Sequence, residues 1–216
     1  MSSTYFNLRR VLASPVIYSS LMSALGAGSG MQRFVREYLR VRPGERVLDL
    51  GCGPGRLYPA LPRVEYCGLD VDAGYLARAR ALFPGARFEQ QDVSTGCPRF
   101  DLRGFDLIVA SGLLHHLPDA AVIRALAFCH ERLRVGGRLI SLDCAFEEGQ
   151  SFLSRLLVAR DRGQFIRRGR GYLDLARAYF PGATLSIRHD LLRVPYCHAI
   201  VVCEKAECEK VECEKR

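Results

Sequence analysis

Apolar residues in this chain gather into short runs that are separated by longer mixed stretches. The runs at residues 47–50, 66–69 and 105–110 have the length and the largely apolar character of strands buried on both faces of a parallel sheet. Helices are expected between the runs, at residues 73–83 and 119–133. This alternation of strand and helix predicts an α/β fold with a doubly wound, mainly parallel sheet.

Turn and capping signals divide the same pattern. Pro84 and Gly85 end the first of these helices, and Asp119 is expected to cap the second. Residues 134–137 read as a turn that leads into another strand. The remaining strands are expected at residues 86–89, 138–143, 184–192 and 196–203.

Glycine-rich and charged segments suggest how the chain is organised around this sheet. Two helices, at residues 4–24 and 31–40, are expected on either side of a glycine-rich link at 26–30. Residues 145–180 are expected to insert two helices around an arginine-rich loop. The expected parts are an N-terminal helical lid at residues 1–41, a main domain at 42–203 and a charged, cysteine-containing tail at 204–216.

The most informative stretch lies at residues 46–56, which read R-V-L-D-L-G-C-G-P-G-R. Its three alternate glycines allow positive φ and the close approach of a ligand. A pyrophosphate-binding G-x-G-x-x-G would need a third glycine where Arg56 stands. Asp49 beside the glycines would repel pyrophosphate but suits a cationic ligand, and Asp70, about 20 residues further on, could accept both ribose hydroxyls. The pattern therefore favours a cationic nucleoside over a dinucleotide.

Residues 49–55, Asp-Leu-Gly-Cys-Gly-Pro-Gly, have the form D-x-G-x-G-x-G and resemble the first motif of the class I S-adenosylmethionine-dependent methyltransferases. The resemblance covers roughly residues 42–203, and it implies that the insertion at 145–180 covers the substrate. It implies a Rossmann-like sheet of seven strands, with helices on both faces and strand seven antiparallel between strands five and six. It also implies S-adenosylmethionine as cofactor, S-adenosylhomocysteine as product, and an in-line methyl displacement that requires no metal.

The resemblance assigns roles to residues at the strand ends. Gly51 and Gly53 would flank the methionine part of the cofactor, and Asp70 would hold the ribose hydroxyls. Asp92 would accept from the adenine amino group, and Ser111 would lie near the sulfonium. Each acid has a plainer alternative, because it could simply cap the helix that follows. The full set expected at the cofactor is Asp49, Gly51, Cys52, Gly53, Asp70, Val71, Asp92, Val93, Ser111 and His115.

Histidines and a tyrosine are the candidates for the chemistry of the acceptor. The pair His115-His116 follows the fourth strand, although many methyltransferases have a similar sequence there without using it in catalysis. Residues 188–198 hold five groups that can exchange protons or bind anions; a surface hairpin with ordinary charges is the alternative interpretation. His189 and Tyr196 are expected to contact the acceptor. The candidate bases are His115, His116, His189 and His198, and the residues predicted to be catalytic are His116, His189 and Tyr196.

The charge pattern bears on the acceptor. The net charge of +8 is carried almost wholly by arginine, which makes it a weak signal for nucleic acid. The five arginines of residues 160–170 could bind a carboxylate or phosphate, although a solvated loop is the alternative. Enzymes that methylate amino groups of nucleic acids usually carry Asn/Asp-Pro-Pro-aromatic where residues 111–114 read Ser-Gly-Leu-Leu. A small-molecule acceptor that could be anionic is therefore expected. A nucleic-acid methyltransferase and a catalytically silent cofactor-binding protein are the alternatives.

Cysteine content bears on location and on metals. Nine cysteines, an odd number, indicate reduced thiols and hence a cytoplasmic protein. Residues 9–28 loosely resemble a signal peptide, but Pro15 and several serines interrupt the stretch, and we expect no membrane span. Cys203, Cys208 and Cys213 fall in a five-residue repeat that could bind a soft metal. A solvated charged extension is the preferred interpretation, and no metal site is predicted.

Overall fold

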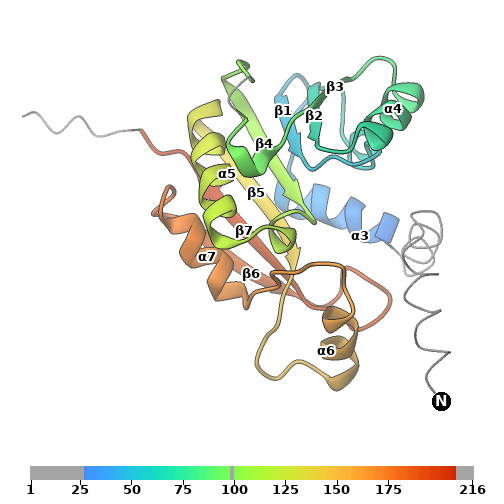
Figure 1. Cartoon of the computed structure of the whole chain (residues 1–216), viewed down its shortest axis with the longest axis vertical. Coiled ribbons are helices and arrows are strands. Elements are labelled where there is room, and N and C mark those ends of the chain that lie inside the picture. The colour runs from blue at the N-terminus through green and yellow to red at the C-terminus, as the bar shows by residue number, and fades with distance from the viewer. Residues whose placement is uncertain (1–26, 98–99, 208–216) are drawn as a thin grey trace, which may run out of the picture.

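A computed structural model describes residues 27–97 and 100–207 of the chain (Figure 1). A seven-stranded sheet with the order β3-β2-β1-β4-β5-β7-β6 runs through it. The strands are β1 Arg46–Leu50, β2 Glu65–Asp70, β3 Arg87–Gln90, β4 Phe105–Ser111, β5 Leu133–Cys144, β6 Thr184–Arg188 and β7 His198–Glu204. β1 to β5 pair in parallel, whereas β7 is antiparallel to both β5 and β6. The predicted fold class and the antiparallel seventh strand are confirmed.

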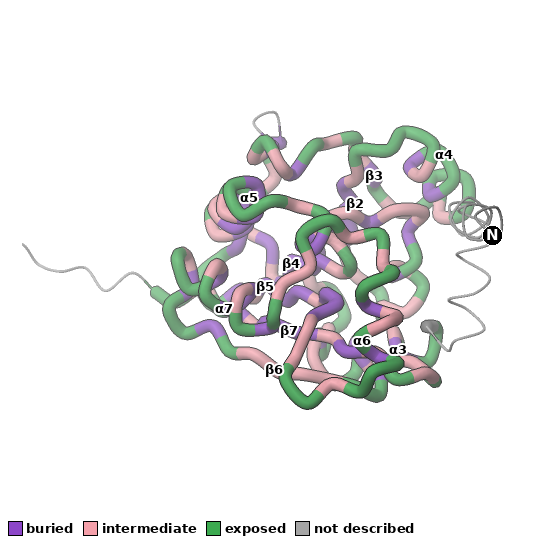
Figure 2. The backbone as a smooth tube through the Cα atoms, turned by 60° about the horizontal axis from the view of Figure 1, so that its bottom comes forward, coloured by how far each residue is buried: buried purple, intermediate pink, exposed green. Residues whose placement is uncertain are grey.

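Helices cover both faces of the sheet. On one face, α5 and α7 pack on Leu48, Leu50 and Ile108, and on the other face α3 and α4 pack on Val47 and Leu107 (Figure 1). Because neighbouring residues of β1 face opposite sides, its largely apolar run is buried on both. The central strands β4, β5 and β7 are likewise largely buried (Figure 2). The helical segments are α3 Ala27–Phe34, the π-helical turn η1 Val35–Leu39, the short 3₁₀ turns η2 Tyr58–Ala60, η3 Val93–Thr95 and η4 Leu114–His116, and the helices α4 Ala73–Leu82, α5 Asp119–Arg132, α6 Phe152–Ala159 and α7 Gly169–Arg177.

Three expected boundaries are wrong. The glycine-rich link is helical from Ala27 on. A Cβ atom on Gly30 would collide with the Leu191 carbonyl, so glycine at this position lets the helix pack against Leu191. The expected turn at residues 134–137 lies within β5, which shifts register against β4 between Phe105 and Leu107. Asp119 is not the cap of α5: Pro118 holds that position, and the Asp119 carboxylate instead accepts hydrogen bonds from Arg167.

The C-terminal part of the chain differs from expectation in two further ways. β6 ends at Arg188, four residues before the expected end, because the chain turns away into a loop that borders the site described below. Cys203 lies in β7 and is buried in the core, so this thiol does not belong to a solvated tail. Cys208 and Cys213, and the helix expected at residues 4–24, lie outside the described residues. Among the described helices, none is long and apolar enough to cross a membrane.

Candidate functional site

A glycine loop follows β1 at the carboxyl edge of the sheet. Gly51, Gly53 and Gly55 all have positive φ, of 67°, 52° and 78°. A Cβ atom on Gly53 would have no neighbour within 4 Å, whereas one on Gly55 would crowd the rings of Phe83 and Phe88. Gly53 therefore faces open space that a ligand can enter, and Gly55 serves the packing of the loop on β3.

Asp70, at the end of β2, is fixed beside this loop. Its Oδ2 accepts from the backbone N–H of Gly53 at 2.8 Å, and its Oδ1 accepts from that of Asp72 at 2.9 Å. Each oxygen keeps a second acceptor position for a ligand hydroxyl. Val71 follows with 64% of its surface exposed, an apolar face next to the carboxylate. The loop, the carboxylate and Val71 thus form one cradle.

Two residues of the expected cofactor set have their side chains below this cradle. Asp49 is 3% exposed and accepts a hydrogen bond of 2.7 Å from the Tyr66 hydroxyl, and burial raises the pKa of Asp49 to about 7. By strand alternation the Asp49 side chain points to the same face of the sheet as Val47. The Cys52 side chain is buried against Gly68. A contact of Asp49 or Cys52 with the cofactor stays a prediction.

Asp92 and Val93 follow β3 on the same edge. The Asp92 side chain is exposed, and its Oδ1 accepts from the backbone N–H of Ser94 at 2.9 Å, which caps η3. Val93 is buried in the core behind it. The capping role that the sequence left open for Asp92 is therefore present. A contact of Asp92 with adenine stays a prediction.

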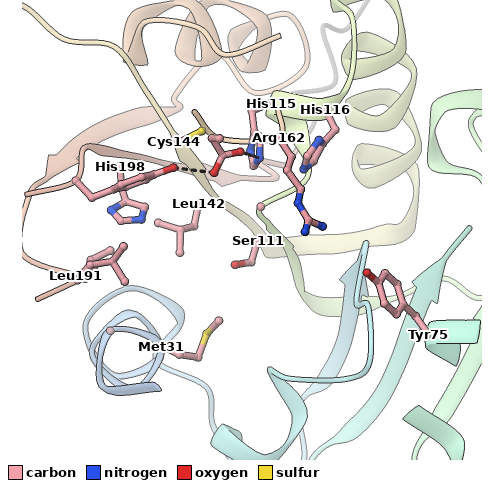
Figure 3. Close-up of a pocket in the computed structure, with 15 residues that line it drawn as sticks. Met31, Tyr75, Ser111, His115, His116, Leu142, Cys144, Arg162, Leu191 and His198 are labelled. Atoms are coloured by element: carbon pink, nitrogen blue, oxygen red, sulfur yellow. Dashed lines mark hydrogen bonds and ion pairs between the residues drawn. The ribbon is translucent and has the colours of Figure 1, made fainter. Parts of the chain in front are cut away.

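A cavity of about 470 Å³ opens next to the cradle (Figure 3). It is bounded by α3, by the ends of β4 and β5, by the loop after α6 and by the loop between β6 and β7. Met31, Leu142 and Leu191 line one part with apolar surface, and polar side chains line the rest. The polar and charged lining residues are Tyr75, Ser111, His115, His116, Asp161, Arg162, Tyr196 and His198, with Cys144 among them.

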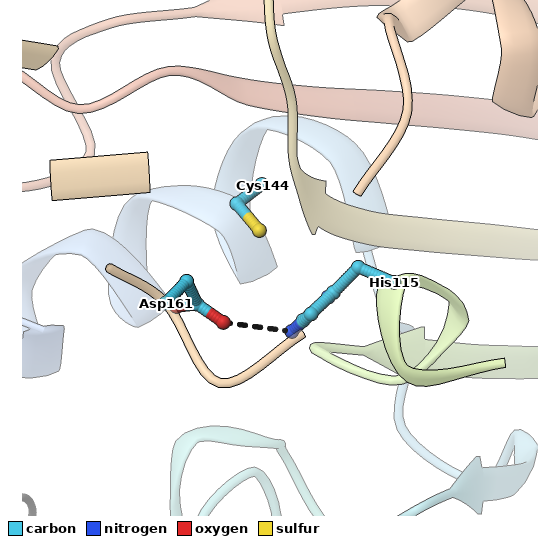
Figure 4. A group of neighbouring side chains, drawn as sticks. All are labelled: His115, Cys144 and Asp161. Carbon is cyan, nitrogen blue, oxygen red and sulfur yellow. Dashed lines mark ion pairs between the residues drawn. The ribbon is translucent and has the colours of Figure 1, made fainter. Parts of the chain in front are cut away.

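His115 is the centre of a buried charged network in the cavity wall. Its Nδ1 is 2.8 Å from Asp143 Oδ1. Its Nε2 is 3.3 Å from Asp161 Oδ1, a contact marked by a dashed line in Figures 3 and 4. Burial lowers the pKa of His115, but the hydrogen bonds and charges of the two carboxylates outweigh burial and raise the pKa to about 9. The imidazole is therefore protonated at neutral pH, and both of its N–H groups are used. His115 thus cannot act as a base.

Tyr196 and the loop after α6 complete this network. The Tyr196 hydroxyl donates to Asp161 Oδ2 at 2.8 Å, and the backbone N–H of Gly163 donates to Asp161 Oδ1 at 3.0 Å. Phe165 donates its backbone N–H to the His115 carbonyl at 2.9 Å. Burial acts to raise the pKa of Asp161, but the hydrogen bond and charge of His115, with the hydrogen bonds from Gly163 and Tyr196, hold this pKa well below its usual range. The loop is thereby fastened to the histidine pair.

His116 and His198 are the two neutral histidines of the cavity. The ring of His116 lies 4.1 Å from that of His115, and burial together with the charge of His115 lowers the pKa of His116. Burial lowers the pKa of His198 to about 4. Each of these rings therefore has an unprotonated nitrogen at neutral pH. The adjacent His115 and His116 consequently have opposite protonation states.

Three side chains of this wall could ligate a metal ion. His115, Cys144 and Asp161 each offer one atom, and these atoms lie within 4.8 Å of one another (Figure 4). Asp143 would orient the histidine from behind, as carboxylates commonly do for histidine ligands. In the structure, however, the His115 and Asp161 atoms contact each other directly, and burial raises the pKa of the Cys144 thiol. The trio is thus arranged as an ion pair beside a protonated thiol.

The remaining site predictions are placed elsewhere. His189 is exposed and lines a second cavity with Gln150 and Ser154, whereas Tyr196 lines the first, and Leu192 borders both. The residues on either side of His189 bind α3 and η1: Arg188 contacts Glu37 at 2.6 Å, and the Asp190 carboxylate contacts Arg33 at 2.9 Å. These charges fasten a loop and are not open to an anionic ligand.

Of the arginine-rich segment, Arg162 alone among the described residues lines the larger cavity. Arg167 donates to the carbonyls of Leu114 and Leu117 at 3.0 and 2.8 Å, besides its contact with Asp119. It therefore fastens the loop to η4 and α5. The five arginines that the sequence groups together have different roles in the fold.

Two acids of the network were missed by sequence reasoning. Asp143 is the next-to-last residue of β5, and its position at a strand end was a signal that could have found it. Asp161 lies in the arginine-rich segment, 46 positions from His115, and no spacing pattern connects the two. Only the folding of that segment over η4 brings them together.

Comparison with known proteins shows which protein family part of this chain resembles. The family model described as a methyltransferase domain matches residues 47–137. A trans-aconitate 2-methyltransferase of Deinococcus radiodurans is 39% identical over 119 residues, which are 52% of this chain and 43% of that protein. A ubiquinone biosynthesis O-methyltransferase of Pseudomonas aeruginosa is 30% identical over 132 residues, 58% of this chain and 55% of that protein. The chain thus matches about half the length of these relatives.

Solved structures match over more of the chain. A TehB-like S-adenosylmethionine-dependent methyltransferase of Corynebacterium glutamicum has a TM-score of 0.60 at 24% identity, and covers 87% of this chain and 96% of its own. The methyltransferase SibL has a TM-score of 0.70 at 17% identity, with 91% and 61% covered. The [4+2]-cyclase SpnF has a TM-score of 0.63 at 19% identity, with 82% and 80% covered. These likenesses establish the fold, and the cyclase among them means that the fold alone does not fix the reaction.

Proposed function

Through residues 47–137 this chain belongs to the class I S-adenosylmethionine-dependent methyltransferase family, and on that premise we propose that it methylates a small molecule. The observation that carries the proposal is the cradle of Gly53, Asp70 and Val71 beside a cavity of about 470 Å³. The cradle supplies open backbone and a fixed carboxylate, and the cavity has room for an acceptor. Relatives named for trans-aconitate, aklanonic acid and ubiquinone biosynthesis support an acceptor of this size.

The residues of the cradle fit S-adenosylmethionine. Gly53 leaves space for its amino-acid part, with Gly51 beside it in the same loop. Asp70 accepts from its ribose hydroxyls, and Val71 offers apolar surface to its adenine. Asp92 keeps a free acceptor position for the adenine amino group. When bound, the cofactor supplies a methyl group on a positively charged sulfur.

The cavity wall suits that charge. One protonated imidazole, His115, lies between the carboxylates of Asp143 and Asp161, which leaves one net negative charge in the network. Such a buried negative charge favours a cation nearby, because the surrounding apolar groups screen it poorly. His116, neutral at neutral pH, can take the proton that a hydroxyl acceptor loses as its oxygen is methylated. Tyr196 holds Asp161 in position through its hydroxyl.

The acceptor could be anionic. Arg162 lies in the cavity lining and would meet a carboxylate or phosphate of the acceptor. Seven described cysteines are free thiols, and they support a reducing compartment, the cytoplasm.

The proposal is tested by calorimetric titration with S-adenosylmethionine and S-adenosylhomocysteine. We expect both to bind, and Asp70→Ala to weaken binding at least tenfold, because the ribose loses its acceptor and the loop loses its bond to Gly53. Asp101→Ala removes the same charge at an exposed position away from the cradle and should leave the affinity unchanged. A folded protein that binds neither compound would contradict the proposal. Binding without transfer to any acceptor would identify a catalytically silent protein.

A further inference from the structure

The cavity wall holds an imidazole, a thiol and a carboxylate that point toward one another (Figure 4). His115 comes from η4, Cys144 ends β5, and Asp161 lies in the loop after α6. One ligand atom from each of them lies within 4.8 Å of the other two. All three side chains also line the cavity, so an ion can reach them from it. Tertiary folding thus assembles three metal-ligand groups of different chemistry at one accessible place.

The spacing of these atoms is close to that around a tetrahedral metal ion. Two nitrogen or oxygen ligands at about 2.0–2.1 Å from a tetrahedral zinc ion lie about 3.3 Å apart. His115 Nε2 and Asp161 Oδ1 are 3.3 Å apart in the structure. A thiolate at about 2.3 Å from the ion lies about 3.5 Å from each of the other two ligands, so from a spread of at most 4.8 Å the trio needs a movement of only about 1 Å.

The groups behind the trio are arranged as the outer partners of a metal site. His115 Nδ1 is 2.8 Å from Asp143 Oδ1, so a proton stays on Nδ1 and Nε2 is the nitrogen turned toward Asp161. Histidine ligands commonly donate their second N–H to a carboxylate in this way. Asp161 Oδ2 accepts from Tyr196, and Oδ1 accepts from the backbone N–H of Gly163. The second lone pair of Oδ1, which now meets His115, is therefore the one that an ion would use.

A divalent cation held by this trio would replace two protons and leave the net charge of the wall unchanged. The imidazolium of His115 between two carboxylates, beside a protonated thiol, carries one net negative charge. A divalent ion with a neutral His115, a Cys144 thiolate and the same two carboxylates also carries one net negative charge. Burial raises the pKa of the Cys144 thiol because an isolated thiolate lacks a counter-charge there, and a bound ion supplies one. The exchange thus adds no uncompensated charge to a buried region.

We propose that His115, Cys144 and Asp161 bind a zinc ion in place of two protons, with the fourth tetrahedral position open to the cavity. A set of one nitrogen, one sulfur and one oxygen suits zinc, and three protein ligands with an open position are typical of zinc sites that also bind a water or another ligand. An oxygen or sulfur atom of a molecule in the cavity can take that position. The inference goes beyond the proposed function, does not depend on it, and departs from the sequence analysis, which predicted no metal site.

The test uses the full-length, untagged chain with Cys208→Ser and Cys213→Ser, so that the thiols of the tail repeat do not bind the metal. This parent chain is titrated calorimetrically with zinc in two buffers of different ionisation enthalpy. We expect one ion per chain and the release of about two protons per ion near neutral pH, because His115 and Cys144 each lose one. Cobalt(II) in the same site should show the intense visible absorption of a tetrahedral ion and a thiolate charge-transfer band in the near ultraviolet.

Three variants of the parent chain separate this site from any other. Cys144→Ala should abolish the thiolate band and weaken zinc binding at least about tenfold. Cys129→Ala is the matched control, because it removes another buried thiol, in α5, and should leave the band and the affinity unchanged. Asp143→Asn should weaken zinc binding about 10–100-fold and retain the thiolate band, since Asp143 only positions His115.

The opposite results overturn the inference. A folded parent chain that takes up no zinc, or releases no protons on taking it up, would show that His115 and Cys144 do not ligate an ion. Zinc binding unchanged in Cys144→Ala would place the ion elsewhere. If Cys144→Ala fails to fold, the cobalt spectrum of the parent chain decides, because a missing thiolate band removes Cys144 from the site. S-adenosylhomocysteine binding is titrated separately, so failure of the proposed function and failure of the zinc site are distinguishable.

Discussion

At the scale of single residues, adjacent positions in the sequence have opposite properties in the fold. His115 is enclosed by Asp143 and Asp161 and has a pKa of about 9, whereas the pKa of His116 is lowered. The two rings are 4.1 Å apart, so the charge on the first is one reason why the second stays neutral. Burial alone would lower the pKa of both. The placement of two carboxylates around one of them therefore decides which histidine is available as a base.

The raised pKa of His115 predicts a pH-dependent contribution to stability. A group whose pKa is higher in the folded than in the unfolded state stabilises the fold below its unfolded value, about 6.5, and loses this effect as the pH rises through the folded value. We expect the difference in unfolding free energy between the wild type and His115→Gln to fall by about 1–3 kcal/mol from pH 6 to pH 9.5. Urea denaturation at several pH values measures it.

His116→Gln is the matched control for this experiment. The pKa of His116 is lowered in the fold, so the proton balance of His116 changes below pH 6.5 and not above it. The stability difference between the wild type and this variant should therefore be flat from pH 6.5 to pH 9.5. A flat profile for His115→Gln as well would mean that His115 is not held as an imidazolium.

At the scale of elements, α3 and η1 are fastened to the loop after β6. Arg188 donates to Glu37 at 2.6 Å and to the Tyr38 hydroxyl at 3.2 Å, and Arg33 reaches the Asp190 carboxylate at 2.9 Å. Gly30 lies directly against the Leu191 carbonyl. Because Gly30 and Leu191 both line the cavity, this contact between two distant segments forms part of the site.

Two glycines of α3 allow the effect of close packing on stability to be measured apart from the effect of helix propensity. Gly30→Ala would place a Cβ atom in the Leu191 carbonyl, and we expect it to destabilise the protein by about 1–3 kcal/mol. Gly28→Ala has open space for its Cβ in the same helix and should instead stabilise by about 0.5–1 kcal/mol. Urea denaturation of both variants gives the comparison. Equal effects of the two substitutions would show that α3 does not pack on the loop in solution.

At the scale of the whole molecule, the sheet and its covering helices bury every described thiol. The seven cysteines between Cys52 and Cys203 are free and buried, and burial raises the pKa of each of them. A thiolate is the reactive form of cysteine, so burial and the raised pKa both protect these side chains. Their reactivity therefore reports on opening of the whole fold.

Thiol labelling tests this protection. In a Cys208→Ser/Cys213→Ser variant, we expect the seven described thiols to stay unreacted toward an aromatic disulfide reagent under native conditions. All seven should react in denaturing urea, and at intermediate urea the labelling should follow the unfolding transition. The absorbance of the released thiolate measures both. Rapid native labelling of a single thiol would point to local opening at the cavity, where Cys144 lies.

The sequence by itself determined the architecture and the cofactor edge. Apolar runs too short for helices could only be buried strands, and the glycines after residue 50, together with the acid at position 70, lie within a few residues of strand ends. The features that form the cradle are therefore local, because each side chain is placed by the strand that it ends. The boundaries that failed, at Gly30 and Asp119, are those at which a contact from a distant segment replaced the local signal.

The acceptor side was decided only by the tertiary structure. Asp143, Asp161 and His198 come from three separate segments. Asp143 and Asp161 both contact His115, and His198 Nδ1 has no hydrogen-bond partner among the described residues. These properties depend on how the loop after α6 and the segment after β6 fold. His189, nine positions from His198, lines another cavity because salt bridges on both sides of it hold the chain against α3. The sequence contains these residue types, but no spacing pattern relates them. Their charge states could not be predicted, because the protonation state of a side chain depends on its neighbours in space.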